Sequence, residues 1–328
     1  MAKTPSIAPT RRGPGRTRPG GAVVDPAALT APVPAPPAFR VVPVLRALRP
    51  AQWIKNGVVL AALVFDRRLF EIDRLLLAAA AVVAFCCVAS SIYLINDVRD
   101  VESDRMHPRK RFRPIAAGEV APRFALGLSG VLMVASLGLS FAIAWQFGLV
   151  IAAYGALMVA YSGGLKRMVI LDVFAIAAGF VLRAAGGAVA IDVPISPWLY
   201  VCTMLAALLI GFGKRRHELG LLGENASAHR ANLDAYSIPL LDQFIAIVAA
   251  STVMAYALYT FDAAAVPDNQ MMMLTLPFVI YGVFRYLYLI YRLQLGGSPE
   301  SLMFVDRPLL GSVIGWALCS AIILYLWS

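Results

Sequence analysis

Long apolar runs alternate with short charged segments along most of the chain. From residue 53 onward, apolar runs of roughly 15–25 residues follow one another, and about 20 such residues cross a bilayer as a helix. We therefore predict an all-α integral membrane protein with about nine transmembrane helices. The expected spans lie near residues 57–65 (extended back to residue 53), 75–95, 124–145, 147–161, 170–191, 198–212, 240–261, 271–291 and 309–327.

Composition agrees with this pattern and divides the chain in two. Of 328 residues, 60% are hydrophobic and 15% are charged, whereas a soluble domain is typically about 45–50% apolar. The first 39 residues are rich in Pro, Ala, Gly and Arg without apolar periodicity. We predict a disordered cytoplasmic arm over 1–39 and a polytopic membrane domain over 40–328. The arginines of the arm either contact anionic lipid or belong to a solvated tail that helps to fix topology.

The net charge of +10 indicates that the protein binds an anionic partner. A basic chain binds nucleic acid, anionic lipid or an anionic substrate, and nucleic acid is excluded because no soluble domain is long enough to present a binding face. Most Lys and Arg residues lie in the arm and in alternate loops, which are expected on the cytoplasmic side. We predict a multi-pass plasma-membrane protein with its amino terminus inside, its carboxyl terminus outside and its chemistry at the cytoplasmic face.

An acidic motif of Asn96, Asp97, Asp100 and Asp104 ends the second expected span. The aspartates are spaced three and four residues apart, which places their carboxylates on one face of a helix. These like charges repel each other unless a cation neutralises them. Oxygen ligands select a hard ion, and Mg²⁺ takes one or two carboxylates together with phosphate oxygens, with Mn²⁺ as an alternative. The competing interpretation is a solvated helix end with incidental carboxylates.

Basic residues occur on both sides of this motif. Lys110, Arg111 and Arg113 follow it, and such cations bind phosphate oxygens directly, although the same charges also serve as a topology signal. Lys55 and Asn56 stand at the start of the first span. Lys55 either contacts substrate or extends its charge to the membrane interface.

Two ionisable residues fall within the fifth span. Arg183 lies near its middle, where a charge costs about 2.5–3.5 kcal/mol on insertion scales and usually faces a cavity. Asp172 precedes it by about three turns and is therefore on the same face. We expect both to line a cavity. The alternative is a structural role, with each partnered by backbone or by other helices.

The acidic motif, at the end of the second of about nine spans, resembles the first signature of the UbiA-type membrane prenyltransferase superfamily. The resemblance covers residues 44–327 and implies a helical bundle whose central cavity opens to the cytoplasm, with Mg²⁺ bound by the aspartates. Usual members carry a second aspartate-rich motif in the loop after the sixth span. Here that stretch is basic and contains Lys214, Arg215 and Arg216, which fits a second anionic substrate better than a neutral aromatic acceptor.

Three further blocks, at residues 49–56, 110–118 and 161–167, are similar to the branch called decaprenyl-phosphate phosphoribosyltransferase. That branch is implied to transfer 5-phosphoribose from phosphoribosyl pyrophosphate to a polyprenyl phosphate, releasing pyrophosphate for cell-wall arabinan precursor synthesis. The resemblance implies catalytic roles for Asp97, Asp100, Lys55 and Asp172, and metal binding by Asn96, Asp97, Asp100 and Asp104. It implies substrate binding by Asn56, Tyr93, Lys110, Arg111, Arg113, Tyr161, Lys166, Arg167, Arg183, Lys214, Arg215 and Arg216.

Two other functions compete with this interpretation. An aromatic prenyltransferase would use a prenyl diphosphate, and the missing second aspartate motif argues against it. A lipid transporter or flippase would also place charges inside a polytopic bundle, but the charges here lie at one face, and no pair of broken helices is evident at mid-membrane. The sequence is compatible with a homo-oligomer.

Overall fold

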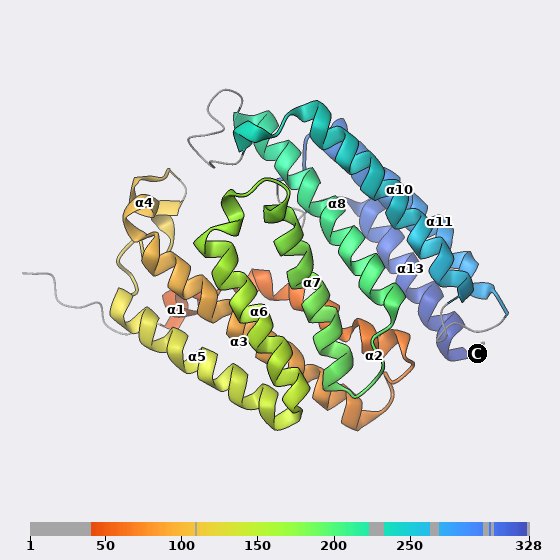
Figure 1. The fold of residues 1–328 in the computed structure, drawn as a ribbon, viewed down its shortest axis with the longest axis horizontal. Helices are drawn as coiled ribbons and strands as arrows, with labels where there is room; N and C mark the ends of the chain where they lie inside the picture. Colours follow the sequence, from red (N-terminus) through yellow and green to blue (C-terminus); the bar gives the residue numbers. More distant parts are fainter. Residues whose placement is uncertain are drawn as a thin grey trace, which may run out of the picture. The chain divides into compact units, whose positions relative to one another are not determined.

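A computed structural model describes residues 41–108, 110–222, 233–262, 269–297, 302 and 305–326. The predicted arm over 1–39 lies outside these residues. Every regular element in the described part is a helix (Figure 1), which confirms the all-α prediction. In chain order the elements are α1 (Val41–Ala47), η2 (Pro50–Leu60), α2 (Ala61–Phe65), α3 (Ile72–Arg99), α4 (Val101–Met106), η3 (Lys110–Phe112), α5 (Pro122–Ile143), α6 (Trp145–Gly163), η4 (Leu165–Arg167), α7 (Leu171–Ala190), α8 (Pro197–Leu222), η6 (Leu233–Ala235), α10 (Ile238–Asp262), η7 (Met271–Thr275), α11 (Leu276–Tyr291) and α13 (Arg307–Leu326).

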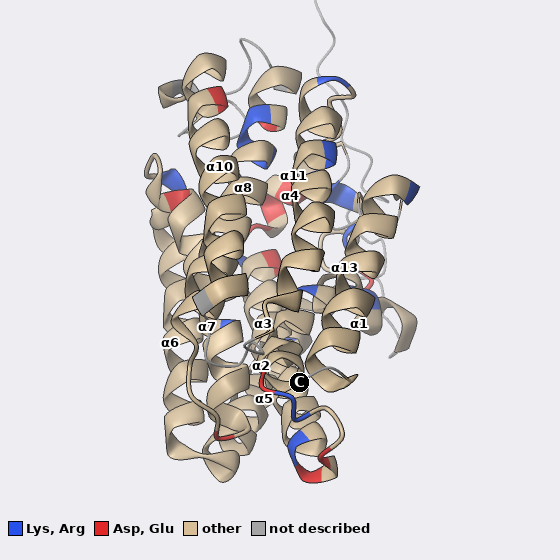
Figure 2. Cartoon of the chain, turned by 90° about the vertical axis from the view of Figure 1, so that its right-hand side faces the viewer, with Lys and Arg blue, Asp and Glu red and all other residues tan. Residues whose placement is uncertain are grey.

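Eight of the predicted spans are confirmed as helices long and apolar enough to cross a membrane in the described part of the chain. Charged residues lie mainly near helix ends, and long uncharged stretches of helix lie between them (Figure 2). The remaining prediction, residues 53–65, corresponds to η2 followed by α2. With about 2.0 Å rise per residue in the 3₁₀ part and about 1.5 Å in the α part, this pair extends roughly 30 Å, the thickness of a hydrocarbon core.

The 3₁₀ helix η2 has 11 residues, and 3₁₀ runs longer than about four residues are uncommon. Residues three apart share a face in this geometry, so Asn56 and Val59 both turn inward and are buried. A Cβ on Gly187 of α7 would lie 1.9 Å from the Val59 carbonyl oxygen. Only glycine at 187 therefore allows η2 to pack this closely on α7, and that contact fixes the neighbouring Lys55 and Asn56.

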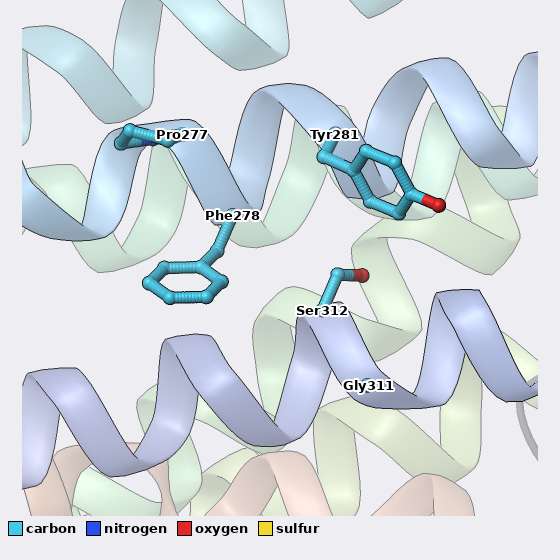
Figure 3. Close-up of a pocket in the computed structure, with 5 residues that line it drawn as sticks. All are labelled: Pro277, Phe278, Tyr281, Gly311 and Ser312. Atoms are coloured by element: carbon cyan, nitrogen blue, oxygen red, sulfur yellow. The ribbon is translucent and has the colours of Figure 1, made fainter.

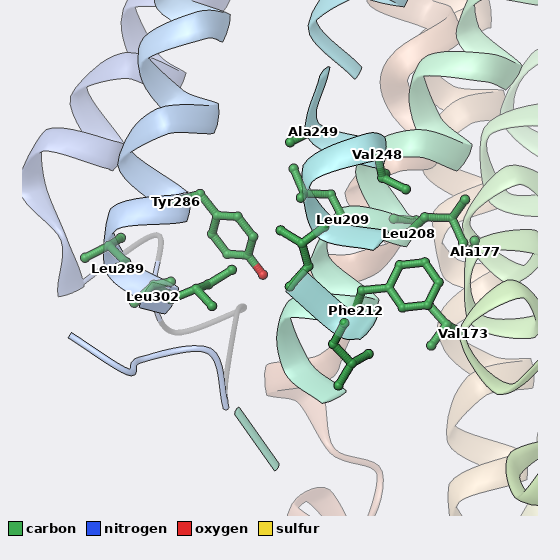
Figure 4. Packing of buried hydrophobic residues seen from close by; sticks show 14 of the residues in the cluster. Val173, Ala177, Leu208, Leu209, Phe212, Val248, Ala249, Tyr286, Leu289 and Leu302 are labelled. Atoms are coloured by element: carbon green, nitrogen blue, oxygen red, sulfur yellow. The ribbon is translucent and has the colours of Figure 1, made fainter. Parts of the chain in front are cut away.

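Helix α7 occupies the middle of the bundle and packs against α3, α6 and η2 as well as α8 (Figure 1). One apolar core joins α7 to α8, α10 and α11, and Figure 4 shows Val173, Phe212 and Tyr286 pointing into it. A second core joins η2, α3 and α6 around Phe85. Because both cores enclose α7, charged residues on this helix are removed from bulk water.

The basic stretch after the sixth span is helical, so its prediction as a loop was wrong. Helix α8 continues to Leu222, ten residues beyond the predicted end at Phe212. Lys and Arg are good helix formers, and their long side chains let a helix extend past the apolar region. Lys214, Arg215 and Arg216 consequently point in different directions, because successive helical residues are rotated by about 100°.

Candidate active site

The predicted carboxylates meet at the junction of α3 and α4. The Asp100 backbone N–H donates to the Asn96 carbonyl (2.9 Å), and the Asp104 N–H donates to the Asp100 carbonyl (2.8 Å), so the helical course continues across the junction. Asp97 and Asp104 are both buried and both contact Nη1 of Arg113, at 3.0 and 2.6 Å. Two of the three aspartates of this motif therefore lie on one face, and Arg113 bridges them.

Arg49 is a second cation on the same carboxylate, and the sequence-based site residues did not include it. Its Nη2 lies 2.5 Å from Asp97 Oδ1. The same oxygen also accepts a hydrogen bond from Arg113. The Arg49 guanidinium carbon lies 4.8 Å from the centre of the Tyr93 ring, a cation–π contact. The only signal in the sequence was that Arg49 opens the block of residues 49–56 before the first span.

A single apolar cluster positions these three charges. Ala47, Leu94 and Ile115 are buried together, and each lies two or three residues along the chain from Arg49, Asp97 or Arg113 respectively. Packing of α1, α3 and the segment after η3 therefore brings the charged side chains to one point. The cluster acts as the rigid support of the site, because a packed apolar core permits little displacement.

The backbone around Arg49 is also held in place. Arg49 adopts a left-handed conformation (φ 56°, ψ 58°), which costs a non-glycine residue roughly 1–2 kcal/mol. The Trp53 indole N–H donates to Ser90 Oγ (3.0 Å), and Ser90 Oγ donates to the Leu48 carbonyl (2.9 Å). These bonds fasten both sides of Arg49 to α3 and direct its side chain toward Asp97.

The donor set of this cluster suits a hard divalent cation. Asp97 and Asp104 supply carboxylate oxygens close enough to share one guanidinium nitrogen, and Asn96 and Asp100 lie half-buried beside them. No group of three His, Cys, Asp or Glu side chains suited to a metal occurs among the described residues. Two protein carboxylates with the rest of the shell from phosphate and water is the usual arrangement for Mg²⁺, so the residues fit that ion.

Arg183 forms a separate network inside the bundle. Its Nε donates to Asn56 Oδ1 (2.7 Å), its Nη2 to the Tyr154 hydroxyl (2.7 Å) and its Nη1 to the Gly179 carbonyl (3.0 Å). No carboxylate pairs with Arg183 among the residues that the structure describes. Asp172 is not one of its contacts either, so the two ionisable residues of α7 belong to different networks.

Asp172 is fully buried and has both carboxylate oxygens occupied. Arg215 Nε lies 2.7 Å from Oδ2, and the Tyr236 hydroxyl donates to Oδ1 at 2.9 Å. Tyr236 lies just before α10, and burial raises its pKa to about 12, so the phenol stays protonated and remains a donor. The same hydroxyl accepts the Ile170 N–H at 2.6 Å. Tyr236 thus joins α10 to the start of α7, a contact that sequence reasoning missed.

Ile170 forms a strained turn between the basic segment η4 and α7. Its backbone angles are φ 69° and ψ −51°, and the Leu171 N–H donates to the Val169 carbonyl at 2.7 Å, which together define a γ-turn of the rare positive-φ kind. A β-branched residue at positive φ is an outlier. The bond from Ile170 to Tyr236 holds this turn, and the turn sets the direction in which η4 leaves α7.

The other predicted site residues come from several elements of the bundle. Lys110 and Arg111 are exposed on η3, Lys166 is half-buried and Arg167 exposed on η4, and Lys55 is half-buried on η2. Tyr161, at the end of α6, is half-buried. On α8, Arg216 pairs with Asp242 of α10 (2.5 Å). Two of the three cations on α8 are therefore neutralised by carboxylates, which sequence could not reveal.

A contact between α3 and α6 relates the acidic junction to the basic segment. Arg99, two residues after Asp97, donates from Nη2 to the Ser162 carbonyl at 3.1 Å. Ser162 is next to Tyr161, and η4 begins three residues after it. The acidic junction and η4 therefore belong to the same end of the bundle.

An apolar groove of about 360 Å³ lies between α11 and α13. Pro277, Phe278 and Tyr281 of α11 line one side, and Gly311 and Ser312 of α13 line the other (Figure 3). None of the candidate site residues lines this groove. We therefore place the candidate active site at the charged junction of α3 and α4 and not here.

Comparisons with known proteins identify a family and several similar proteins. The sequence profile of the UbiA prenyltransferase family matches residues 57–306. The chain is 38% identical over 298 residues to the decaprenyl-phosphate phosphoribosyltransferase of Mycolicibacterium smegmatis, covering 87% of this chain and 93% of that one. It is 37% identical over 296 residues to the enzyme of the same name from Corynebacterium glutamicum, covering 86% of each. A UbiA homolog from Archaeoglobus fulgidus bound to GPP and Mg²⁺ has the same fold, with a TM-score of 0.64 at 16% identity over 87% of this chain and 100% of that one.

Proposed function

Because the chain belongs to the UbiA prenyltransferase family, we propose that it transfers 5-phosphoribose from phosphoribosyl pyrophosphate to a polyprenyl phosphate such as decaprenyl phosphate, with release of pyrophosphate. The two relatives with that activity in their names match over most of both chains. The product would supply cell-wall arabinan synthesis from the plasma membrane. The amino terminus lies inside, the carboxyl terminus outside, and the site faces the cytoplasm.

The observation that carries this proposal is the charge pattern of the site. Carboxylates suited to one metal lie at the α3–α4 junction. Where a second carboxylate cluster would serve a prenyl diphosphate, α8 instead has Lys214, followed by Arg215 and Arg216, which are already paired. Arg183 adds a buried cation that no described carboxylate neutralises. Such a site complements a diphosphate together with further phosphate groups, as the proposed pair of substrates requires.

The reaction needs no strong general base. An oxygen of the polyprenyl phosphate, already anionic at neutral pH, forms a bond to the anomeric carbon while the bond from that carbon to pyrophosphate breaks. Mg²⁺ bound at Asp97 and Asp104, with Asn96 and Asp100 completing the set, would neutralise charge on the leaving pyrophosphate. Positioning and electrostatic stabilisation by the surrounding residues supply the remaining catalysis.

The contacts distinguish the roles of the chain's own residues. Lys55 lies next to Asn56, which holds Arg183, so these three residues would bind phosphate on the bundle side. The exposed Lys110 and Arg111, with Lys166 and Arg167, would bind phosphate from the cytoplasmic side. Asp172 has no free oxygen and is completely buried. It acts as a positioning residue and does not contact the reacting atoms.

Tyr236→Phe tests the positioning role of Asp172. Loss of the hydroxyl releases the Ile170 turn, so the Michaelis constant for phosphoribosyl pyrophosphate should rise about 10-fold, in line with a lost hydrogen bond to a charged group, while kcat stays close to wild type. Steady-state kinetics would measure both. Tyr325→Phe is the matched control, because its hydroxyl also accepts a backbone N–H, from Leu69. A fall in kcat alone would contradict the assignment.

Lys214→Ala tests whether the α8 cations contribute to binding. Lys214 is half-buried, and its neighbours Arg215 and Arg216 are already paired, so Lys214 is the one best placed to bind substrate. We expect the Michaelis constant of one substrate to rise about 10-fold. Arg123→Ala, an exposed cation at the start of α5, should leave both constants unchanged. Equal Michaelis constants for the two variants would show that Lys214 does not bind substrate and serves only as a topology signal.

The function itself is tested with membranes that contain the protein. One reaction contains labelled phosphoribosyl pyrophosphate and polyprenyl phosphate, and the other contains labelled prenyl diphosphate and an aromatic acid. We expect labelled lipid in the first reaction only. Labelled product in the second reaction alone would establish an aromatic prenyltransferase. Movement of polyprenyl phosphate across sealed vesicles without any labelled product would establish a transporter.

A further inference from the structure

Arg49 and Arg113 shield the carboxylates of the α3–α4 junction from solvent. The side chains of Asp97 and Asp104 are each 3% exposed, whereas those of Arg49 and Arg113 are 27% and 29% exposed. A ligand that approaches the site therefore meets the guanidinium groups first. Two cations and two anions also make this four-residue cluster neutral.

The arginines bind the oxygens that a metal ion would need. Asp97 Oδ1 receives both guanidinium groups, at 2.5 Å from Arg49 and 3.0 Å from Arg113. Arg113 Nη1 also donates a hydrogen bond to Asp104 Oδ2 at 2.6 Å. A divalent cation on these oxygens would stand beside two positive charges. It must displace the guanidinium groups, and displacement leaves partly buried cations without counter-ions, which is unfavourable.

A diphosphate removes that difficulty. Its oxygens accept the forked donors of guanidinium groups and at the same time complete the coordination shell of a hard cation. We propose that Arg49 and Arg113 exchange partners during substrate binding: they pair with Asp97 and Asp104 in the resting site and with the diphosphate when the metal occupies these carboxylates. The metal and the diphosphate consequently bind together, and the metal alone binds weakly.

The local structure permits this exchange. Backbone bonds and the apolar cluster of Ala47, Leu94 and Ile115 fix the positions from which the two arginines extend. Their guanidinium groups lie at the outer surface of the site and are free of further carboxylates among the described residues. Arg49 keeps the Tyr93 ring as a second contact. The exchange therefore requires rotation of these half-buried side chains and no movement of the helices.

This inference rests on the proposed function only in taking a diphosphate as ligand, and direct binding measurements test it. Calorimetry on the purified full-length protein would compare Mg²⁺ alone with pyrophosphate in the presence of Mg²⁺. For Arg113→Gln we expect opposite changes. Affinity for Mg²⁺ alone should rise, because a competing cation is gone. Affinity for pyrophosphate with Mg²⁺ should fall at least about 10-fold, because a charge-assisted hydrogen bond is lost.

Two further variants keep the experiment decisive. Arg49→Gln removes the contact to Asp97 and the one to the Tyr93 ring, but none to Asp104. It should show the same opposite changes if Arg113→Gln fails to fold. Arg46→Gln is the matched control, because Arg46 pairs with the exposed Glu119 outside the site, and neither affinity should change. Two affinities that fall together, or an unchanged affinity for Mg²⁺ alone, would overturn the exchange. Opposite changes without phosphoribosyl transfer would overturn the proposed function and leave the exchange standing.

Discussion

Asp97→Asn should reduce phosphoribosyl transfer by more than about 100-fold, beyond the roughly 10–100-fold cost of losing a residue that only supports a metal ligand. Asparagine keeps the shape of the side chain but removes the charge that a divalent cation requires. Arg49 and Arg113, which both contact Asp97 Oδ1, retain a neutral oxygen acceptor. The loss should therefore appear in kcat and in the Mg²⁺ concentration needed for half-maximal rate, both measured with saturating substrates.

Glu102→Gln is the matched control for Asp97→Asn. Glu102 lies on α4 within the same acidic segment and pairs with Arg105, but its side chain is 83% exposed. Removing its charge should leave both the rate and the Mg²⁺ requirement unchanged. If Asp97→Asn keeps near-wild-type activity at the Mg²⁺ concentration that suffices for wild type, Asp97 is not a metal ligand.

The fold was predictable because lipid imposes a strong regularity on the sequence. A long apolar run has to form a helix in a bilayer, since its backbone groups find no water there, and eight predicted spans are confirmed on that basis. The first span was harder to interpret. Nothing in its composition indicates that Pro50–Leu60 forms a 3₁₀ helix, because this geometry depends on close packing against Gly187.

The site was predictable in its acidic part and less so in its basic part. The spacing of Asp97 and Asp104 encodes their common face, and local helical geometry is sufficient to place them together. The partners of cations depend instead on tertiary packing. Arg215 and Arg216 are neighbours in sequence, yet one pairs with α7 and the other with α10. Tyr236 contributes through a contact 64 residues away in sequence, which no local pattern reports.

The different burial of Arg215 and Arg216 leads to the second large prediction. Side chains of Arg215 and Asp172 are 2% and 0% exposed, whereas those of Arg216 and Asp242 are 17% and 35% exposed. Asp172→Asn removes a charge-assisted hydrogen bond from a fully buried pair, although Glu218 still pairs with Arg215 at 2.5 Å. The free energy of unfolding should therefore fall by about 1.5–3 kcal/mol. Asp242→Asn, the matched change in a pair that water reaches, should cost no more than about 1 kcal/mol. Reversible unfolding in mixed micelles would measure both values.

A double variant tests whether the buried charges themselves contribute to stability. Asp172→Leu with Arg215→Met replaces the buried pair by apolar side chains of comparable size, and such replacements are often neutral or stabilising by about 1–4 kcal/mol. The double variant should therefore be more stable than Asp172→Asn, although Tyr236 loses its acceptor. Its Michaelis constant for phosphoribosyl pyrophosphate should still be raised. The Tyr236 hydroxyl still accepts the Ile170 N–H, but without Asp172 the position of the Tyr236 side chain is no longer fixed. If the double variant is as unstable as Asp172→Asn, attraction within the pair contributes to stability and apolar packing does not replace it. Equal destabilisation by Asp172→Asn and Asp242→Asn would show that water reaches both pairs.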